Sequence, residues 1–182
     1  PRRWIFTEIW RNNVWRGEES ASGRGSEAEE ARRAIDAVER VIAARGVRTL
    51  LDLPCGDYHW MRQVRRAGVH YIGGDIVRRI VEENAARHAD DTTEFRVLDI
   101  VTDPLPAADL ILVRDCFVHL SRREIERALA NIRRAGIPLL LMTHYTGDRP
   151  FRDITTGLWR PVNFTLAPFS LPVPIGIYPE HS

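Results

Sequence analysis

The stretch Thr49-Leu-Leu-Asp-Leu-Pro-Cys-Gly-Asp57 decides the fold, because a short β-prone run ends there in a turn of small and acidic residues. A second run of the same kind, Tyr71-Ile-Gly-Gly-Asp-Ile-Val77, follows after a helix-like stretch at Trp60–Ala67. Strands that alternate with helices form a parallel sheet whose two faces are both covered. We therefore predict an α/β fold: a Rossmann-like, doubly wound, mostly parallel sheet with helices on both faces.

The rest of the chain continues this alternation. Ser121 and Glu124 stand at the positions of a capping box, which predicts that a helix begins there, and Gly46 is placed to end an earlier helix. The further strands are expected at Phe95–Ile100, Asp109–Arg114 and Leu139–Tyr145, and the helices at Glu27–Ala44, Arg78–His88 and Arg122–Arg134.

The chain of 182 residues, 44% of them hydrophobic, fits one domain with one core. We divide it into an N-terminal lid or helix segment at 1–46, a cofactor-binding core at 47–145 and a C-terminal segment at 146–182. The helix before the core would serve as a lid or as a dimer contact, so a homodimer is possible. The Pro-rich C-terminal segment would add to the sheet edge or close over a ligand.

Composition argues against several classes of partner. The 26 basic residues, all of them Arg, are balanced by 25 acidic ones, so the net charge of +1 favours neither nucleic acid nor an anionic membrane. No apolar run approaches the roughly 20 residues that span a bilayer. Cys55 and Cys116 are too few for a disulfide framework, and we expect them to be buried free thiols in a reducing cytoplasm.

Acidic residues stand at the predicted carboxyl ends of the strands, where open parallel sheets bind ligands. Asp52 and Asp57 bracket the first turn, Asp75 ends the second strand, Asp99 ends the third and Asp115 follows the fourth. An acid at the end of the second strand can accept both hydroxyls of a ribose, and we assign that role to Asp75. We expect this carboxylate to be solvated, so that replacing it leaves the fold intact.

The turn after the first strand is suited to an anion. Gly56 lets the backbone approach a ligand closely, and the start of the following helix would present unpaired N–H groups to a carboxylate. A methionine carboxylate would suit this place.

Four segments together are similar to the successive cofactor motifs of class I S-adenosylmethionine-dependent methyltransferases. The resemblance runs from Thr49 to Tyr145 and departs from the family at Pro54 and Cys55, which stand where it usually has glycine. The segments are Thr49–Asp57, Tyr71–Val77, Phe95–Ile100 and Asp109–Leu120.

The resemblance implies S-adenosylmethionine as the cofactor. It places the amino-acid part at the Asp52–Asp57 turn, the ribose at Asp75, the adenine beside Asp99 and Ile100, and the passage to the acceptor at Arg114–Phe117. The residues expected to bind the cofactor are Asp52, Pro54, Cys55, Gly56, Asp57, Asp75, Ile76, Asp99, Ile100, Arg114 and Asp115.

Two histidines are candidates for a general base, since an imidazole titrates near working pH. His119 follows the fourth strand and would take a proton from an acceptor hydroxyl, or else cap or pack beneath the next helix. His144, after the fifth strand, is the second candidate, and Asp115 would orient either one. No close pair of metal ligands accompanies them, so we expect no metal.

The acceptor is expected to be a small molecule with a hydroxyl, such as a sugar or a natural-product intermediate. Asp115-Cys-Phe-Val118 replaces the Asn-Pro-Pro-Tyr type of sequence that methylation of nucleobase amines would need. The alternatives are an RNA or protein methyltransferase, suggested by the Arg content, and a nicotinamide-dependent oxidoreductase, although G-x-G-x-x-G is missing. A third alternative is a non-catalytic binding domain.

Overall fold

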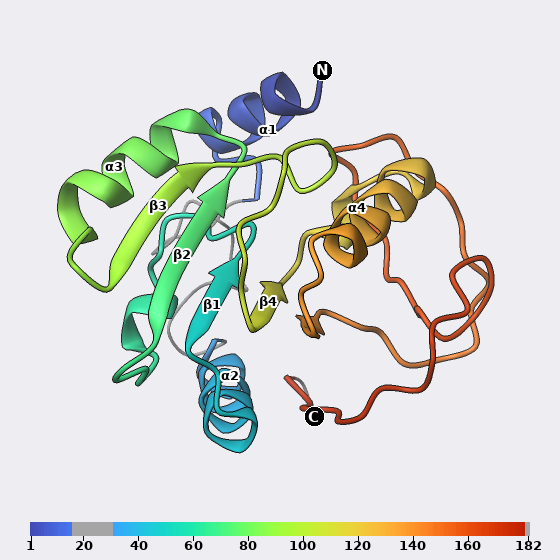
Figure 1. Ribbon diagram of the computed structural model, residues 1–182. Coiled ribbons are helices and arrows are strands. Elements are labelled where there is room, and N and C mark those ends of the chain that lie inside the picture. The colour runs from blue at the N-terminus through green and yellow to red at the C-terminus, as the bar shows by residue number, and fades with distance from the viewer. Residues whose placement is uncertain (16–30, 181–182) are drawn as a thin grey trace.

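The computed structural model describes residues 1–15 and 31–180 and contains one five-stranded sheet, in which every neighbouring pair of strands is parallel (Figure 1). The strand order is β3-β2-β1-β4-β5. The predicted Rossmann-like α/β fold is confirmed. The strands are β1 (Thr49–Asp52), β2 (His70–Asp75), β3 (Thr93–Val97), β4 (Leu110–Val113) and β5 (Leu139–Met142).

The direction in which the strands are added reverses between β1 and β4. From β1 the chain continues to β2 and β3 on one side, whereas β4 lies on the other side of β1 and is followed by β5. Leu50 of β1 pairs with Leu110 of β4, so the two carboxyl ends lie side by side. Such a switch point leaves a crevice in which open α/β sheets bind ligands.

Three predicted helices are confirmed. In the described part, α2 covers Arg32–Arg45 and ends at Gly46, whose φ of 60° lies in the left-handed region that glycine adopts easily. The predicted start of this helix, residues 27–30, lies outside the described residues. The other two are α3 (Arg78–His88) and α4 (Arg122–Arg134), and α4 begins with the expected capping box of Ser121 and Glu124.

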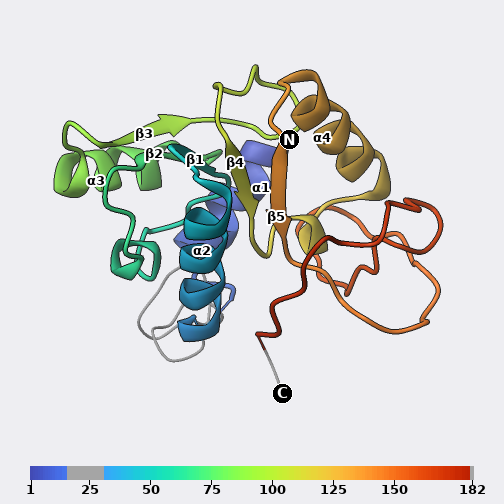
Figure 2. The ribbon, with the colours of Figure 1, turned by 60° about the horizontal axis from the view of Figure 1, so that its bottom comes forward.

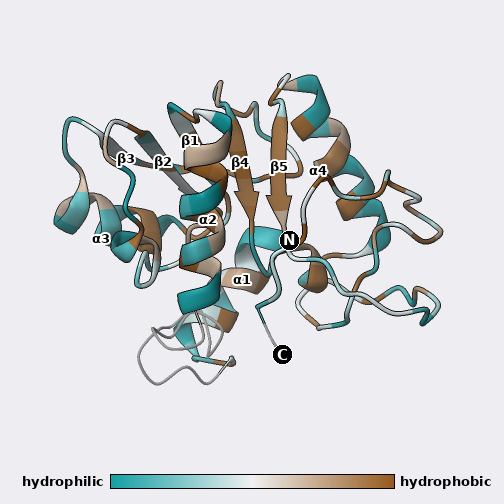
Figure 3. Cartoon of the chain, turned by 90° about the horizontal axis from the view of Figure 1, so that it is seen from below, coloured by the Kyte–Doolittle hydropathy of each residue, from teal (hydrophilic) through white to brown (hydrophobic). Residues whose placement is uncertain are grey.

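The two faces of the sheet are buried by different helices. Alternate residues of β4 illustrate this, because Leu110 and Leu112 belong to an apolar cluster with α2, whereas Ile111 and Val113 belong to another with α4. Figure 3 shows the hydrophobic strands β4 and β5 between these two helices. Burial on both faces explains why β4, Leu-Ile-Leu-Val, is wholly apolar.

The helix predicted at Trp60–Ala67 is wrong. The structure has one 3₁₀ turn at Met61–Gln63, and the backbone of Val64 is already extended. Trp60, Met61 and Val64 are all buried in the cluster that contains α2. Packing of these side chains against the sheet therefore replaces the regular helix that their spacing indicated.

The largest differences from the predicted bounds are in β3 and β5, which each end three residues before the predicted end. β3 begins at Thr93, two residues before Phe95, because Thr93 already pairs with Tyr71 of β2. It ends at Val97, so Asp99 lies in the turn beyond the strand and accepts a hydrogen bond from the backbone N–H of Val101 at 2.9 Å. β5 ends at Met142, before the predicted Tyr145.

The chain after Met142 forms no helix or strand in its described part, which ends at residue 180. Figure 2 shows this segment, in orange to red, beside α4. Val162 and Phe164 are buried in the cluster that contains α4, and the N–H of Tyr145 donates to the carbonyl of Val162 at 3.0 Å. The segment therefore joins the core without adding a strand to the sheet edge.

A helix near the start of the chain, α1 (Arg2–Arg11), lies over the carboxyl end of β2 (Figure 1). This helix lies in the N-terminal lid or helix segment predicted at 1–46. None of the helices in residues 1–15 and 31–180 is long and apolar enough to cross a membrane.

Candidate active site

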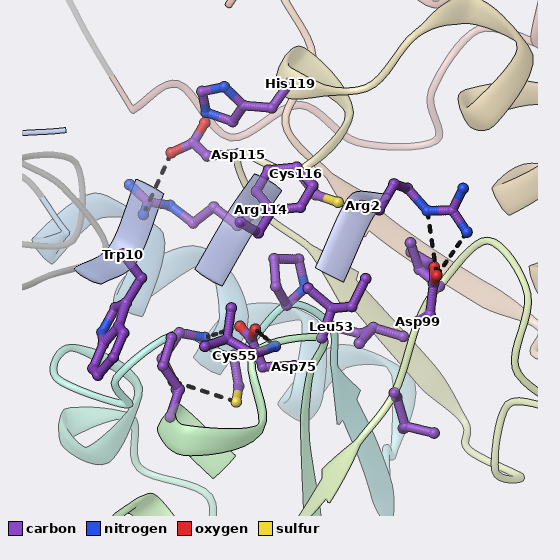
Figure 4. Close-up of a pocket in the computed structure, with 18 of the residues that line it drawn as sticks. Arg2, Trp10, Leu53, Cys55, Asp75, Asp99, Arg114, Asp115, Cys116 and His119 are labelled. Atoms are coloured by element: carbon purple, nitrogen blue, oxygen red, sulfur yellow. Dashed lines mark hydrogen bonds and ion pairs between the residues drawn. The ribbon is translucent and has the colours of Figure 1, made fainter. Parts of the chain in front are cut away.

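A cavity, here called the first cavity, opens at the carboxyl ends of β1, β2 and β4 and is covered by α1. Figure 4 shows Asp75 and Cys55 on one side of it, His119 and Asp115 on the other, and Arg114 between them. The predicted site residues that line it are Pro54, Cys55, Gly56, Asp75, Ile76, Asp99, Ile100, Arg114, Asp115 and His119.

Asp75 ends β2 and points into this cavity, but it is not solvated as we expected, since only 5% of the residue is exposed. One carboxylate oxygen accepts a hydrogen bond from the N–H of Val77 at 2.8 Å and the other from the N–H of Gly56 at 3.2 Å. Burial raises the pKa of this carboxyl to about 6. Each oxygen keeps a further lone pair for a ligand hydroxyl.

The turn between β1 and β2 is fixed by polar contacts from below. The N–H of Cys55 donates to the carbonyl of Gly74 at 2.7 Å, and the buried side chain of Asn84, on α3, donates to the carbonyl of Gly56 at 2.8 Å. Gly56 has a φ of 54°, which glycine adopts without strain. The role of Asn84 was missed in the sequence, where it is one polar residue among many in a helix.

Two of the predicted cofactor residues do not line the first cavity. Asp52 is 1% exposed and accepts a hydrogen bond from the hydroxyl of Tyr71 at 2.7 Å, while burial raises its pKa to about 7. Asp57 accepts a hydrogen bond from the N–H of His59 at 3.2 Å and thus stabilises the turn. Both lie behind or beside the turn, and contact with a cofactor stays a prediction for them.

The cover of the cavity comes from α1 and was not foreseen in detail. Arg2 donates from Nε at 3.2 Å and from Nη2 at 2.6 Å to Asp99, and from Nη1 at 3.0 Å to Glu124 at the start of α4. Phe6 and Trp10 of the same helix line the cavity. No local sequence pattern predicts the pairing of Arg2 with Asp99, because the two residues are 97 positions apart.

His119 stands where the first cavity meets a second one and lines both. Its Nδ1 lies 2.9 Å from the carbonyl oxygen of Leu158. Since a carbonyl can only accept, Nδ1 carries the proton and Nε2 of the neutral ring keeps its lone pair. Burial lowers the pKa of His119, which favours this neutral form. The ring of Trp15 packs against the imidazole, with 4.9 Å between the two ring centroids.

The turn that carries His119 is held from the C-terminal segment. Arg160 donates from Nη1 to the carbonyls of Phe117 at 2.8 Å and Val118 at 3.0 Å, and from Nη2 to the carbonyl of Leu120 at 2.6 Å. This buried guanidinium fixes the backbone on both sides of His119. It is a positioning residue that the sequence analysis did not identify.

His144 is less suited to the same role. Its Nδ1 accepts a hydrogen bond from the N–H of Phe164 at 3.3 Å, so the proton of the neutral ring is on Nε2 and that atom can only donate.

Asp115 accepts a hydrogen bond from the hydroxyl of Thr143 at 3.2 Å, and its carboxylate lies 3.7 Å from the guanidinium of Arg114. The structure therefore engages Asp115 with these two neighbours, whereas we had expected it to orient a histidine.

The second cavity continues from the first, and the two share Trp15, Trp60, Arg114, Asp115 and His119. Its other walls come from α2, β4, β5 and the segment that follows β5 up to the last described residues, and several of the lining residues are aromatic or proline. Across residues 1–15 and 31–180, no three His, Cys, Asp or Glu side chains are grouped to hold a metal ion.

A parallel sheet with its cavity at the switch point and a buried acid at the end of β2 defines a domain that binds a nucleoside cofactor. Residues 50–138 match the family model described as a methyltransferase domain. This segment is therefore a methyltransferase domain, and the resemblance seen in the sequence is confirmed.

Solved structures share the fold. The N-methyltransferase NodS from Bradyrhizobium japonicum WM9, in complex with S-adenosylhomocysteine, superposes with a TM-score of 0.56 at 16% identity, over 74% of this chain and 68% of that one. Magnesium protoporphyrin IX methyltransferase from Synechocystis PCC 6803, with the same ligand, gives a TM-score of 0.52 at 16% identity, over 73% of this chain and 65% of that one.

Human N-acetylserotonin methyltransferase in complex with S-adenosylmethionine matches at a TM-score of 0.44 and 17% identity, over 74% of this chain. The present chain spans only 45% of that protein's length, and less than two thirds of the magnesium protoporphyrin enzyme. No curated protein sequence matches the chain.

Proposed function

We propose that the protein transfers a methyl group from S-adenosylmethionine to a hydroxyl of a small molecule. The observation that carries the proposal is the first cavity, in which Gly56, Asp75 and Ile100 line one space within a methyltransferase domain. When bound, S-adenosylmethionine supplies an electrophilic methyl group, so the protein has mainly to align the acceptor and exclude water.

The residues of the first cavity fit this cofactor. The carboxylate of Asp75 would accept the ribose hydroxyls, and the apolar side chains of Leu53, Leu98 and Ile100 offer a dry surface for a flat base. The backbone at Gly56 leaves room for the amino-acid part. The cover by Phe6 and Trp10 of α1 would exclude water from the sulfonium.

The acceptor would enter through the second cavity and meet the cofactor beside His119. Nε2 of the neutral imidazole would take the hydroxyl proton as the oxygen attacks the methyl carbon. The proton thus stays on His119 while the methyl group goes to the acceptor. Because Nδ1 is fixed on the carbonyl of Leu158, the ring can take this proton without turning.

The three segments of the chain would have different roles at the two cavities. Residues 1–46 would cover the cofactor, 47–145 would bind it, and 146–182 would complete the acceptor cavity, as the lining residues of both cavities support. We keep a reducing cytoplasm as the proposed setting, since both Cys55 and Cys116 are free.

The test is a calorimetric titration with S-adenosylhomocysteine, run beside NAD as a control. We expect micromolar binding of S-adenosylhomocysteine and none of NAD. Binding of NAD alone would favour the oxidoreductase alternative, and binding of neither would contradict the proposed activity. A filter-binding titration that shows salt-sensitive RNA affinity would instead favour an RNA acceptor.

A further inference from the structure

The junction of the two cavities contains a buried cation whose fork faces the acceptor side. Arg114 is 9% exposed and its guanidinium packs over the ring of Trp60 at 5.2 Å. Its Nη2 donates to one carboxylate oxygen of Glu180 at 2.8 Å, and its Nε lies 3.2 Å from both oxygens. A guanidinium fork of this kind matches a carboxylate in shape and charge.

Glu180 reaches this fork from the second cavity. It lines the second cavity, whereas the lining of the first includes Arg114 but not Glu180. The carboxylate that Arg114 binds therefore stands on the acceptor side of the junction. A ligand group in the same place would lie next to His119, which lines both cavities.

The segment that brings Glu180 to this position is weakly packed. Val173, Ile175 and Ile177 are 82%, 80% and 60% exposed, although all three are apolar. Tyr178 is partly buried against the cluster that contains α2. Since apolar burial contributes little before Tyr178, the ion pair with Arg114 has a large share in holding this segment in the cavity.

We propose that the second cavity takes an acceptor that combines an aromatic or apolar body with a carboxylate, and that Glu180 occupies the carboxylate subsite on Arg114 until the acceptor replaces it. This inference rests on the proposed methyl transfer and names its substrate class. Asp115 lies 3.7 Å from Nη1 of Arg114, but the fork of Nε and Nη2 is paired with Glu180, so a ligand that displaces Glu180 has to bring a carboxylate to that fork. The aromatic walls of the cavity, among them Tyr145 and Trp159, suit a flat body.

The test uses a panel of hydroxylated aromatic carboxylic acids, each paired with its primary amide, and protein saturated with S-adenosylhomocysteine. Affinities are measured by calorimetry for the wild type and for Glu180→Gln. We expect acids to bind better than their amides, and Glu180→Gln to bind the acids at least about tenfold more tightly because the internal competitor has lost its charge. The amides should gain nothing.

Two further variants separate the explanations. Arg114→Gln should abolish the preference for acids. Glu126→Gln, which breaks an exposed ion pair with Arg122 on α4, should leave that preference as in the wild type.

A panel in which no acid binds better than its amide to any variant would overturn the inference. So would a gain in affinity that Glu180→Gln shows for S-adenosylhomocysteine but not for 5′-methylthioadenosine, since Arg114 would then bind the cofactor's own carboxylate. Absence of S-adenosylhomocysteine binding would count against the proposed function itself.

Discussion

At the scale of single residues, the site depends on ionisable groups whose protonation is set by burial. Asp75 is the main example, because it must be ionised to accept two ribose hydroxyls, yet burial raises its pKa to about 6. The backbone N–H groups of Gly56 and Val77 offset part of this effect. Its charge state, and with it the affinity for a nucleoside, should therefore change within an ordinary range of pH.

We expect the affinity for S-adenosylhomocysteine to fall on acidification through the pKa of Asp75. With a pKa of about 6, roughly a tenth of the carboxyl groups are ionised at pH 5, so binding should be about tenfold weaker there than at pH 8. Calorimetric titrations across this range measure it. Asp75→Asn should bind weakly at every pH, whereas the exposed control Asp91→Asn should keep the wild-type profile. A wild-type affinity that does not change with pH would contradict the ribose assignment.

The two histidines should differ in their effect on turnover. His119 presents an unprotonated Nε2 at the junction of the cavities, while Nδ1 of His144 accepts a backbone N–H. We expect His119→Asn to lower kcat by about 10²- to 10⁴-fold, the usual contribution of a general base. His144→Asn should cost much less. Initial rates of S-adenosylhomocysteine release with an acceptor from the acid panel measure both, and a larger loss in His144→Asn would reverse our assignment.

At the scale of elements, β2 carries two glycines that let side chains pack beneath the cofactor turn. A Cβ on Gly74 would lie 2.8 Å from Cδ1 of Leu53 and 3.0 Å from Cδ1 of Leu98, and a Cβ on Gly73 would lie 2.6 Å from the ring of Phe95. Leu53 and Leu98 both line the first cavity. The absence of a side chain at Gly74 therefore leaves room for two residues of the cavity wall.

Gly74→Ala is expected to destabilise the protein by about 1 to 3 kcal/mol, since Leu53 and Leu98 must shift in a packed core. The same shift should weaken binding of S-adenosylhomocysteine. Urea unfolding and calorimetry measure the two effects. Gly176→Ala is the matched control, because its nearest neighbour would be 3.4 Å from the new Cβ, and it should change stability by no more than about 0.5 kcal/mol. Equal stability of both variants would show that β2 can accommodate a Cβ at Gly74 without displacing Leu53 or Leu98.

Elements with a strong local signal could be predicted from the sequence. β4 and β5 carry continuous apolar runs, and α4 carries its capping box in Ser121 and Glu124, and these signals predict all three elements. The turn at Met61–Gln63 was taken for a longer helix, because its apolar spacing is helical whereas its structure is decided by burial against α2. Contacts between distant segments, such as Arg160 with the turn of His119, leave no local pattern and were missed.

The candidate site was predictable to the extent that it lies at strand ends. Asp75, Asp99 and Asp115 follow strands and line the first cavity as expected. Asp52 also ends a strand, but its side chain points to Tyr71 beneath the turn, and the direction of a side chain at a strand end is decided by tertiary packing. Burial of Asp75 could not be foreseen for the same reason.

At the scale of the whole molecule, stability is linked to pH through Asp52. Burial raises its pKa from 3.8 to about 7, so the folded protein binds this proton where the unfolded chain has released it. The stabilising effect of this group is complete below the unfolded pKa and is lost as pH rises through about 7. Its ionisation therefore opposes folding at neutral and alkaline pH.

The expected outcome is that Asp52→Asn gains stability relative to the wild type as pH increases from 5 to 8. The amide oxygen can still accept the hydroxyl of Tyr71, and it has no charge to bury. Urea unfolding across this pH range measures the difference between the free energies of unfolding of the two proteins. Both proteins carry the same histidines, so the effects of the histidines cancel in this difference. A difference in unfolding free energy that is constant with pH would show that Asp52 does not titrate there.

The contact of Arg2 with Asp99 and Glu124 has a consequence for the timing of the reaction. It joins the cover of the first cavity to the two halves of the sheet, since Asp99 follows β3 and Glu124 lies in the helix between β4 and β5. We expect a spent cofactor beneath α1 to leave after this bridge opens. The residence time of the product, and with it the upper limit on turnover, would then depend on the opening of a partly buried ion pair and not on the chemistry of methyl transfer.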